Sequence, residues 1–148
     1  MTWELLEEAC VLPKTLSGEH VAVYLGATND DYAYLTIRDA PDHVDHHSYA
    51  GISRGMIANR ISYTFDLHGE SMTVDSGQSS SLVAVHLACE SLRNGESPLA
   101  IAGGVNLNLA NETAMLEREF GAVSASGHTY AFDARADGYV RSEGVGLV

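Results

Sequence analysis

Apolar positions in this chain follow two different periods, and the two alternate along the sequence. Alternating or continuous runs of apolar and β-branched residues predict strands at Val21–Gly26, at residues 71–75 and at residues 99–105. Apolar residues spaced three and four apart predict helices at residues 2–10 and 51–63. The run at 99–105 is apolar throughout, which is typical of a central parallel strand covered on both faces. This order of elements predicts a layered α/β fold.

A third helix is predicted to follow the strand at residues 71–75. Four residues at helical spacing would form its apolar face: Leu82, Val85, Cys89 and Leu92. Arg93 falls in the last predicted turn, where the helix dipole favours a cation, and Gly95 is suited to end the helix. Residues 77–79 are therefore predicted to form a strand-to-helix corner.

Gln78 is the most informative residue of this corner. The first backbone N–H groups of a helix have no intrahelical acceptor, and the helix dipole adds partial positive charge there. Such a corner favours an anion or a polarised carbonyl group, and Gln78 lies where the donors point. An ordinary structural explanation also exists, in which Ser76 or Ser79 caps the helix and Gln78 is a surface residue of the first turn.

The composition is typical of a piece of a soluble α/β protein. Of the 148 residues, 45% are hydrophobic and 19% are charged, which is near the globular average. A formal net charge of −12 repels nucleic acid and anionic membrane surfaces, so neither is expected as a partner. No apolar run reaches the roughly 20 residues of a membrane span, and no signal pattern opens the chain, so a cytoplasmic location is expected. The two cysteines fit a reducing compartment.

Five separated sequence blocks carry a resemblance to a known family. They are Ala58-Asn59-Arg60-Ile61-Ser62-Tyr63, Thr73-Val74-Asp75, Ser79-Ser80-Ser81-Leu82-Val83-Ala84-Val85-His86-Leu87-Ala88, Ala102-Gly103-Gly104-Val105-Asn106 and Ala131-Phe132-Asp133-Ala134-Arg135-Ala136-Asp137-Gly138-Tyr139-Val140-Arg141-Ser142-Glu143-Gly144. With these blocks the chain resembles the ketosynthase domains of modular type I polyketide synthases, which are thiolase-like condensing enzymes. The resemblance implies a thiolase-like layered α/β fold (αβαβα), of which this chain would form the N-terminal half only.

The chain is expected to be a partial β-ketoacyl synthase domain over residues 1–148, truncated at both ends. It opens directly in a predicted helix and closes within an apolar run at residues 145–148. The resembling family completes its active site with two histidines from the later half of the domain, which this sequence does not contain. Alone, the chain is therefore expected to be inactive and poorly soluble.

The departure from the family lies at the nucleophile, where an elongating ketosynthase has a cysteine and this chain has Gln78. A glutamine there resembles the glutamine-type ketosynthases of loading modules. The resemblance implies decarboxylation of a malonyl or methylmalonyl group to an acetyl or propionyl starter unit. Gln78 is the one catalytic residue expected in this chain, with a polarising and positioning role at the enolate oxygen.

Neither cysteine is expected to replace the missing nucleophile. Cys10 follows the first predicted helix, and Cys89 lies on the predicted apolar face of the third. Both are interpreted as small buried hydrophobic residues, because a reactive thiol needs an accessible, electropositive setting.

The resemblance also implies partners. The substrate would be carried on the phosphopantetheine arm of an acyl carrier protein, with an acyltransferase domain in the same polypeptide and no cofactor in this domain. The family is homodimeric, and residues 71–75 would be the strand at the two-fold interface. The extender preference, malonyl or methylmalonyl, is not encoded in these residues.

Two other functions stay open beside the decarboxylating enzyme. One is a non-catalytic partner subunit, resembling the chain-length factors of type II systems, which also carry glutamine near this turn. The other is an inactive ketosynthase kept as a dimerisation scaffold. An adjacent acyltransferase and carrier domain would favour the enzyme, and a separate neighbouring ketosynthase gene would favour the partner subunit.

Two further motifs carry weaker hypotheses. Residues 39–47 are predicted to be a long polar loop whose histidines and carboxylates could bind zinc, but they lack a complete ligand set at a recognised spacing. Ser79 lacks the second glycine of a hydrolase nucleophile elbow. The loop is therefore interpreted as solvated, and no metal site or serine nucleophile is expected.

Overall fold

The computed structural model describes residues 1–39 and 41–148, which divide into two compact units. The sheet unit consists of residues 1–30, 45–106 and 144–148. The second unit consists of residues 31–44 and 107–143. The corner around Gln78 lies wholly within the sheet unit.

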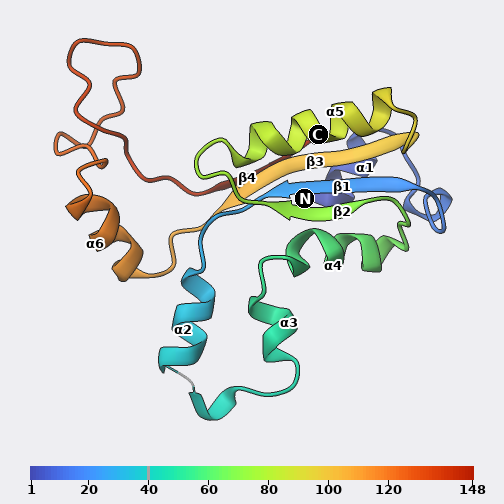
Figure 1. Ribbon diagram of the computed structural model, residues 1–148, viewed down its shortest axis with the longest axis horizontal. Coiled ribbons are helices and arrows are strands. Elements are labelled where there is room, and N and C mark those ends of the chain that lie inside the picture. Colours follow the sequence, from blue (N-terminus) through green and yellow to red (C-terminus); the bar gives the residue numbers. More distant parts are fainter. Residues whose placement is uncertain (40) are drawn as a thin grey trace. The chain divides into compact units, whose positions relative to one another are not determined.

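Four strands form one mixed sheet in the sheet unit, in the order β2-β1-β3-β4 (Figure 1). The strands are β1 (Val21–Gly26), β2 (Ser71–Val74), β3 (Leu99–Asn106) and β4 (Gly144–Leu147). β1 pairs in parallel with both β2 and β3, and β4 runs antiparallel to β3. The three predicted strands are confirmed. Because β1, β2 and β3 are parallel, their carboxyl ends meet at one edge of the sheet, where the turn after β2 begins.

Successive side chains of β1 point to opposite faces of the sheet and join two separate apolar clusters. On one face, Val23 shares a cluster with Leu6 of α1 (Thr2–Glu8) and Ala58 of α4 (Met56–Phe65). On the other face, Tyr24 shares a cluster with Ala84 of α5 (Ser80–Arg93). Figure 1 shows α4 and α5 on opposite sides of the sheet, which gives the helix–sheet–helix layers of an α/β fold.

Small residues let α5 approach the sheet closely. A Cβ atom added at Gly26 would lie 2.6 Å from the backbone of Ser80, and one added at Gly104 would lie 2.8 Å from the Ser81 side chain. The buried residues of α5 are themselves small: Ser80, Ala84, Ala88 and Ser91. The apolar face predicted for this helix is therefore wrong.

Hydrophobic periodicity located α5 but chose the wrong side of it. Leu82 is 74% exposed and Leu92 is 44% exposed, while Val85 and Cys89 are partly buried. A helix packed this closely on a sheet needs small side chains at the contact, and the larger ones lie elsewhere. The predicted helix end is confirmed, because Gly95 has a φ of +71° and the Glu96 N–H bonds the Ser91 carbonyl at 3.0 Å.

Two predicted helices have different bounds in the structure. α1 ends at Glu8 rather than at residue 10, because Cys10 adopts a left-handed φ of +56°, and the short 3₁₀ helix η1 (Pro13–Thr15) follows. The helix predicted at residues 51–63 is two helices, α3 (Ser48–Ile52) and α4. Ser53 separates them with an extended backbone, at ψ 120°.

The second unit contains α2 (Asp31–Asp39), the short 3₁₀ helix η2 (Pro41–His43) and α6 (Asn111–Glu119). Residues 39–47, predicted to be one long loop, include the end of α2 and η2, and Ala40 lies outside the described residues. Asp31 is 2% exposed and accepts hydrogen bonds from the Leu109 and Ala110 N–H groups, both at 2.9 Å, and from the Thr113 hydroxyl. Its carboxylate thereby holds the segment that leads into α6, together with the Thr113 side chain of the first turn, from a distant part of the sequence.

None of the helices in the described part of the chain is long and apolar enough to span a bilayer.

Candidate active site

The turn between β2 and α5 places Gln78 on the surface of the sheet unit. Gly77 has a φ of +67°, a backbone conformation that glycine adopts without steric cost. Ser76 and Gln78, on either side of it, form an isolated parallel β-bridge immediately before the helix. Gln78 is exposed and directly precedes Ser79, the N-cap residue of α5. The predicted strand-to-helix corner is confirmed.

The serines of this turn do not cap the helix as predicted. Ser79 occupies the N-cap position, but its backbone is helical and its side chain makes no capping hydrogen bond. Its hydroxyl instead donates to the Ser76 carbonyl at 3.0 Å. Ser80 closes the turn, because its hydroxyl donates to the Gly77 carbonyl at 2.6 Å and accepts the Ser76 N–H at 3.0 Å.

The start of α5 supplies hydrogen-bond donors next to Gln78. The helical ladder begins with the Val83 N–H, which bonds the Ser79 carbonyl at 3.0 Å. The N–H groups of Ser81 and Leu82 precede that ladder, and the helix is 14 residues long. The positive end of the helix dipole therefore lies beside the exposed Gln78 side chain.

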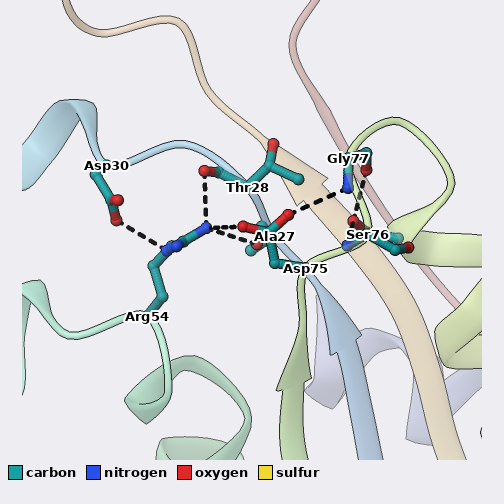
Figure 2. A network of polar contacts seen from close by, with 8 residues as sticks. Ala27, Thr28, Asp30, Arg54, Asp75, Ser76 and Gly77 are labelled. Carbon is teal, nitrogen blue, oxygen red and sulfur yellow. Dashed lines mark hydrogen bonds and ion pairs between the residues drawn. The ribbon is translucent and has the colours of Figure 1, made fainter.

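Arg54 joins the turn to the segment that follows β1 (Figure 2). Its Nη1 donates to Asp75 Oδ2 at 2.5 Å and to the Thr28 carbonyl at 2.8 Å. Its Nε pairs with Asp30 Oδ1 at 2.9 Å. The other Asp75 oxygen, Oδ1, accepts the Gly77 N–H at 3.2 Å. One carboxylate thus connects the arginine to the glycine next to Gln78.

The ionised form of Asp75 is favoured by these contacts. The hydrogen bond from Arg54 holds the pKa of Asp75 below its ordinary value, and the Gly77 N–H acts in the same direction. Asp75 is therefore a carboxylate at neutral pH, and both of its oxygens can accept the hydrogen bonds from Arg54 and Gly77.

Sequence patterns pointed to Gln78 as a candidate but missed the polar contacts beside it, from Asp75 to Gly77 and from Arg54 to Asp75. Asp75 lies two residues before Gly77, a spacing at which Asp side chains commonly bond the backbone of a turn. That signal was present in the sequence. Arg54 is 21 residues from Asp75, and no local pattern links the two.

The two cysteines, both interpreted from the sequence as buried, differ in their exposure. Cys10 is exposed, so its interpretation as a buried hydrophobic residue is wrong, and Cys89 is partly buried. Cys89 lies ten residues after Ser79 along α5, which corresponds to about 15 Å at the helical rise. It therefore lies well away from the Gln78 turn.

The segment with possible metal ligands is organised by hydrogen bonding. Asp45 Oδ1 accepts the backbone N–H of His47 at 2.8 Å and that of Ser48 at 3.0 Å, just before α3. Within residues 1–39 and 41–148, no three His, Cys, Asp or Glu side chains lie close enough together to hold a metal ion.

Comparison with known proteins identifies relatives over the whole chain. The family model for the beta-ketoacyl synthase N-terminal domain matches residues 1–148. A polyketide synthase of Streptomyces halstedii, GfsA, is 57% identical over 148 residues, which are 100% of this chain and 2% of that protein. The 6-methylsalicylic acid synthase of Penicillium terrestre is 46% identical over 100% of this chain and 8% of its own length.

Solved ketosynthases have the same fold. The ketosynthase from module 6 of the Bacillus subtilis bacillaene synthase superposes with a TM-score of 0.84 at 35% identity, over 96% of this chain and 23% of that one. The oxazolomycin ketosynthase domain OzmH KS7 of Streptomyces albus superposes with a TM-score of 0.86 at 34% identity, over 99% of this chain and 26% of that one. The predicted thiolase-like fold is confirmed. The chain belongs to the beta-ketoacyl synthase family, as an N-terminal ketosynthase domain of the kind found in modular type I polyketide synthases.

Proposed function

We propose that the protein containing this chain decarboxylates a malonyl or methylmalonyl group to form the acetyl or propionyl starter unit of a polyketide. The observation that carries the proposal is Gln78, an exposed carboxamide on the strand-to-helix turn of a ketosynthase domain. A condensing enzyme holds its growing chain as a thioester, and an amide nitrogen is too weak a nucleophile to form one. Decarboxylation needs no covalent intermediate on the protein.

The proposed reaction breaks the bond between the α-carbon and the carboxylate of the malonyl thioester. The electron pair of that bond moves into an enolate, whose negative charge develops on the thioester oxygen, and carbon dioxide leaves. The α-carbon then takes a proton from water, which gives the acetyl thioester. The barrier falls to the extent that fixed donors meet the enolate oxygen in the transition state.

Gln78 supplies donors of the required kind. Its backbone N–H and its side-chain amide lie at the positive end of α5, beside the first N–H groups of the helix. We assign the Gln78 amide to the enolate oxygen, where it polarises the thioester and orients it. The histidines and the further donor that the family brings to this site come from residues outside this sequence.

The substrate and partners follow from the family. The malonyl group is carried on the phosphopantetheine arm of an acyl carrier protein, loaded by an acyltransferase domain of the same polypeptide, and this domain holds no cofactor. The protein is a homodimer in this proposal. The open edge of β2 supports this arrangement, because β2 pairs only with β1 among the described residues. The curated relatives are far longer than this chain, which spans 2% to 8% of the two described above.

The test is the Gln78→Ala variant of the full-length protein, assayed for loss of carbon dioxide from a malonyl-loaded carrier. Removing one donor of this kind costs about 10²- to 10³-fold in rate, and that decrease is expected. Asn94→Ala is a matched control, since it removes an amide from the far end of the same helix. Its rate should equal that of the wild-type protein.

Two results would overturn the proposal. Decarboxylation by Gln78→Ala at the wild-type rate would remove Gln78 from the chemistry. A wild-type protein that releases no carbon dioxide, but activates a separate ketosynthase or only dimerises, would be a partner subunit or a scaffold instead.

A further inference from the structure

We propose that Arg54 is a positioning residue for the turn that carries Gln78. The inference deepens the proposed function, since it names what fixes the orientation of the Gln78 amide. Arg54 lies in the segment between α3 and α4, and among the hydrogen bonds and ion pairs of the described residues it reaches the turn through Asp75. We therefore infer that it acts on Gln78 through another residue.

The guanidinium of Arg54 brings three separate segments together. Nε pairs with Asp30 Oδ1 at 2.9 Å, and Nη1 donates to the Thr28 carbonyl at 2.8 Å, both in the segment after β1. Nη1 also donates to Asp75 Oδ2 at 2.5 Å, after β2. Figure 2 shows the guanidinium lying between Asp30 on one side and Asp75 on the other. Because the guanidinium is planar and rigid, its contacts with Asp30 and Thr28 fix the direction from which Asp75 is held.

Asp75 passes this constraint to the turn. Its two oxygens have different partners, Arg54 at Oδ2 and the Gly77 N–H at Oδ1. The other side-chain hydrogen bonds of the turn that the described residues make are internal, since the Ser76, Ser79 and Ser80 hydroxyls bond within residues 76–80. Internal bonds preserve the shape of a turn but do not orient it. Among the side-chain contacts of the described residues, the Arg54–Asp75 pair is the one that ties this turn to the segment after β1.

The position of Arg54 separates this role from general stabilisation. Its side chain is 33% exposed and belongs to neither apolar cluster of the sheet unit. Its carboxylate partners Asp30 and Asp75 are 44% and 45% exposed, and ion pairs that are open to solvent contribute little to overall stability. Its orientation effect can still be large, because a misplacement of about 1 Å in a catalytic group can cost on the order of 10²-fold in rate.

The first experiment compares Arg54→Met, Arg54→Lys and the control Arg93→Met in the full-length protein. Arg93 lies at the other end of α5 in an exposed pair with Glu90. We expect Arg54→Met to lower kcat for decarboxylation by about 10- to 100-fold, with the KM for malonyl carrier unchanged within about twofold. Arg93→Met should leave both constants unchanged. Where Gln78→Ala lowers kcat in the same assay, an unchanged kcat in Arg54→Met would overturn the proposal.

The second experiment does not depend on decarboxylation. In a Gln78→Cys background, the rate of alkylation by iodoacetamide is measured against pH, which reports the pKa and the setting of the thiol at the turn. We expect Arg54→Met to raise the apparent pKa of this thiol and to slow its alkylation at neutral pH by about 3- to 10-fold, as the turn leaves the helix donors. Arg54→Lys keeps the charge but lacks the fork geometry, so we expect it to restore only part of the rate.

The outcomes distinguish this inference from the proposed function. An alkylation profile unchanged by Arg54→Met, or fully restored by Arg54→Lys, would overturn the positioning role, since charge alone would then account for any effect. Altered profiles in both variants support it, even if Gln78→Ala decarboxylates normally and the proposed function fails. Should Arg54→Met not fold, which thermal unfolding would reveal, the Arg54→Lys profile decides alone.

Discussion

In the sheet unit the best-buried large side chains are apolar or aromatic, whereas the best-buried side chain described in the second unit is the carboxylate of Asp31. Val23 of β1 is 0% exposed and lies among hydrophobic neighbours. Asp31 is 2% exposed and lies among hydrogen-bond donors. Apolar packing is sensitive to added volume, while a buried acceptor is sensitive to its own removal or protonation. The two units should therefore respond to different perturbations.

Close packing and carboxylate contacts meet at the Gln78 turn. The helix that follows the turn, α5, packs closely on the sheet at Gly26 and Gly104. The turn itself is oriented by the Asp75 carboxylate, as the segment before α6 is held by Asp31. The helix is therefore fixed by packing, whereas the orientation of the turn depends on charge.

The largest effect is expected from adding volume beneath α5. In Gly26→Ala the new Cβ would lie 2.6 Å from the backbone of both Ser80 and Ser81, and backbone cannot move aside cheaply. We expect a loss of about 3 kcal/mol in the free energy of unfolding of the sheet unit. Hydrogen exchange of peptides from β1 and β3 in the full-length protein should accelerate by about 100-fold.

Gly51→Ala is the matched control for this change. Gly51 lies in α3, and an added Cβ there has no atom within 4 Å. Alanine should stabilise that helix by up to about 1 kcal/mol. If both substitutions accelerated exchange of β1 equally, close packing under α5 would not be what holds the sheet unit together.

A smaller effect is expected from removing the buried acceptor of the second unit. Asp31→Ala leaves the Leu109 and Ala110 N–H groups and the Thr113 hydroxyl without their acceptor. The expected cost is about 2 kcal/mol, measured as faster hydrogen exchange over residues 107–119. Peptides from β1 and β3 should exchange at the wild-type rate.

Asp39→Ala tests whether the loss of any carboxylate in this unit would accelerate hydrogen exchange over residues 107–119. Asp39 pairs with Arg38 in α2, but its side chain is 53% exposed. Its removal should leave exchange unchanged within error, because exposed ion pairs contribute little. An equal effect of both substitutions would show that the buried contacts of Asp31 at the start of α6 stabilise the unit no more than an exposed ion pair does.

The difference between apolar packing and carboxylate contacts also explains which features could be predicted from the sequence. The strands Val21–Gly26 and Leu99–Asn106 were predictable because residues 21–26 and 99–105 are continuous apolar runs, and this pattern is local. The Gln78 corner was predictable because strand and helix patterns adjoin there. Contacts between distant residues leave no such pattern. Asp31 accepts a hydrogen bond from Ala110, 79 residues further along the chain, and Arg54 reaches Asp75 across 21 residues.

The wrong face of α5 has a different cause. Leu82 and Leu92 follow helical periodicity, but the helix buries its serines and alanines against Gly26 and Gly104. Periodicity ranks faces by hydrophobicity, whereas a close helix–sheet contact selects for small volume. Pairing the small-residue face of α5 with the glycines at the strand ends would have been the better signal.

The smallest expected effect comes from acid, and it should act on carboxylate-held segments alone. Burial pushes the pKa of Asp31 upward, but hydrogen bonds from Thr113, Ala110 and Leu109 outweigh it and hold that pKa below the ordinary value. The hydrogen bond from Ser124 likewise holds the pKa of Asp137 low. A lowered pKa in the folded state means that the stabilisation is complete above about pH 4 and is lost as the pH falls through the lowered value.

The measurement is hydrogen exchange at pH 5 and pH 3, corrected for the intrinsic rate at each pH. Residues 107–143 and 75–80 should exchange faster at pH 3, since Asp75 also has a lowered pKa, set by its bond to Arg54. The effect should be smaller than that of Asp31→Ala, because a protonated carboxyl still accepts hydrogen bonds. β1 and β3 should not change, as their clusters contain no carboxylate. Loosening of β1 before residues 75–80 would mean that the turn is held by packing rather than by Asp75, so this result would also count against the orienting role of Arg54.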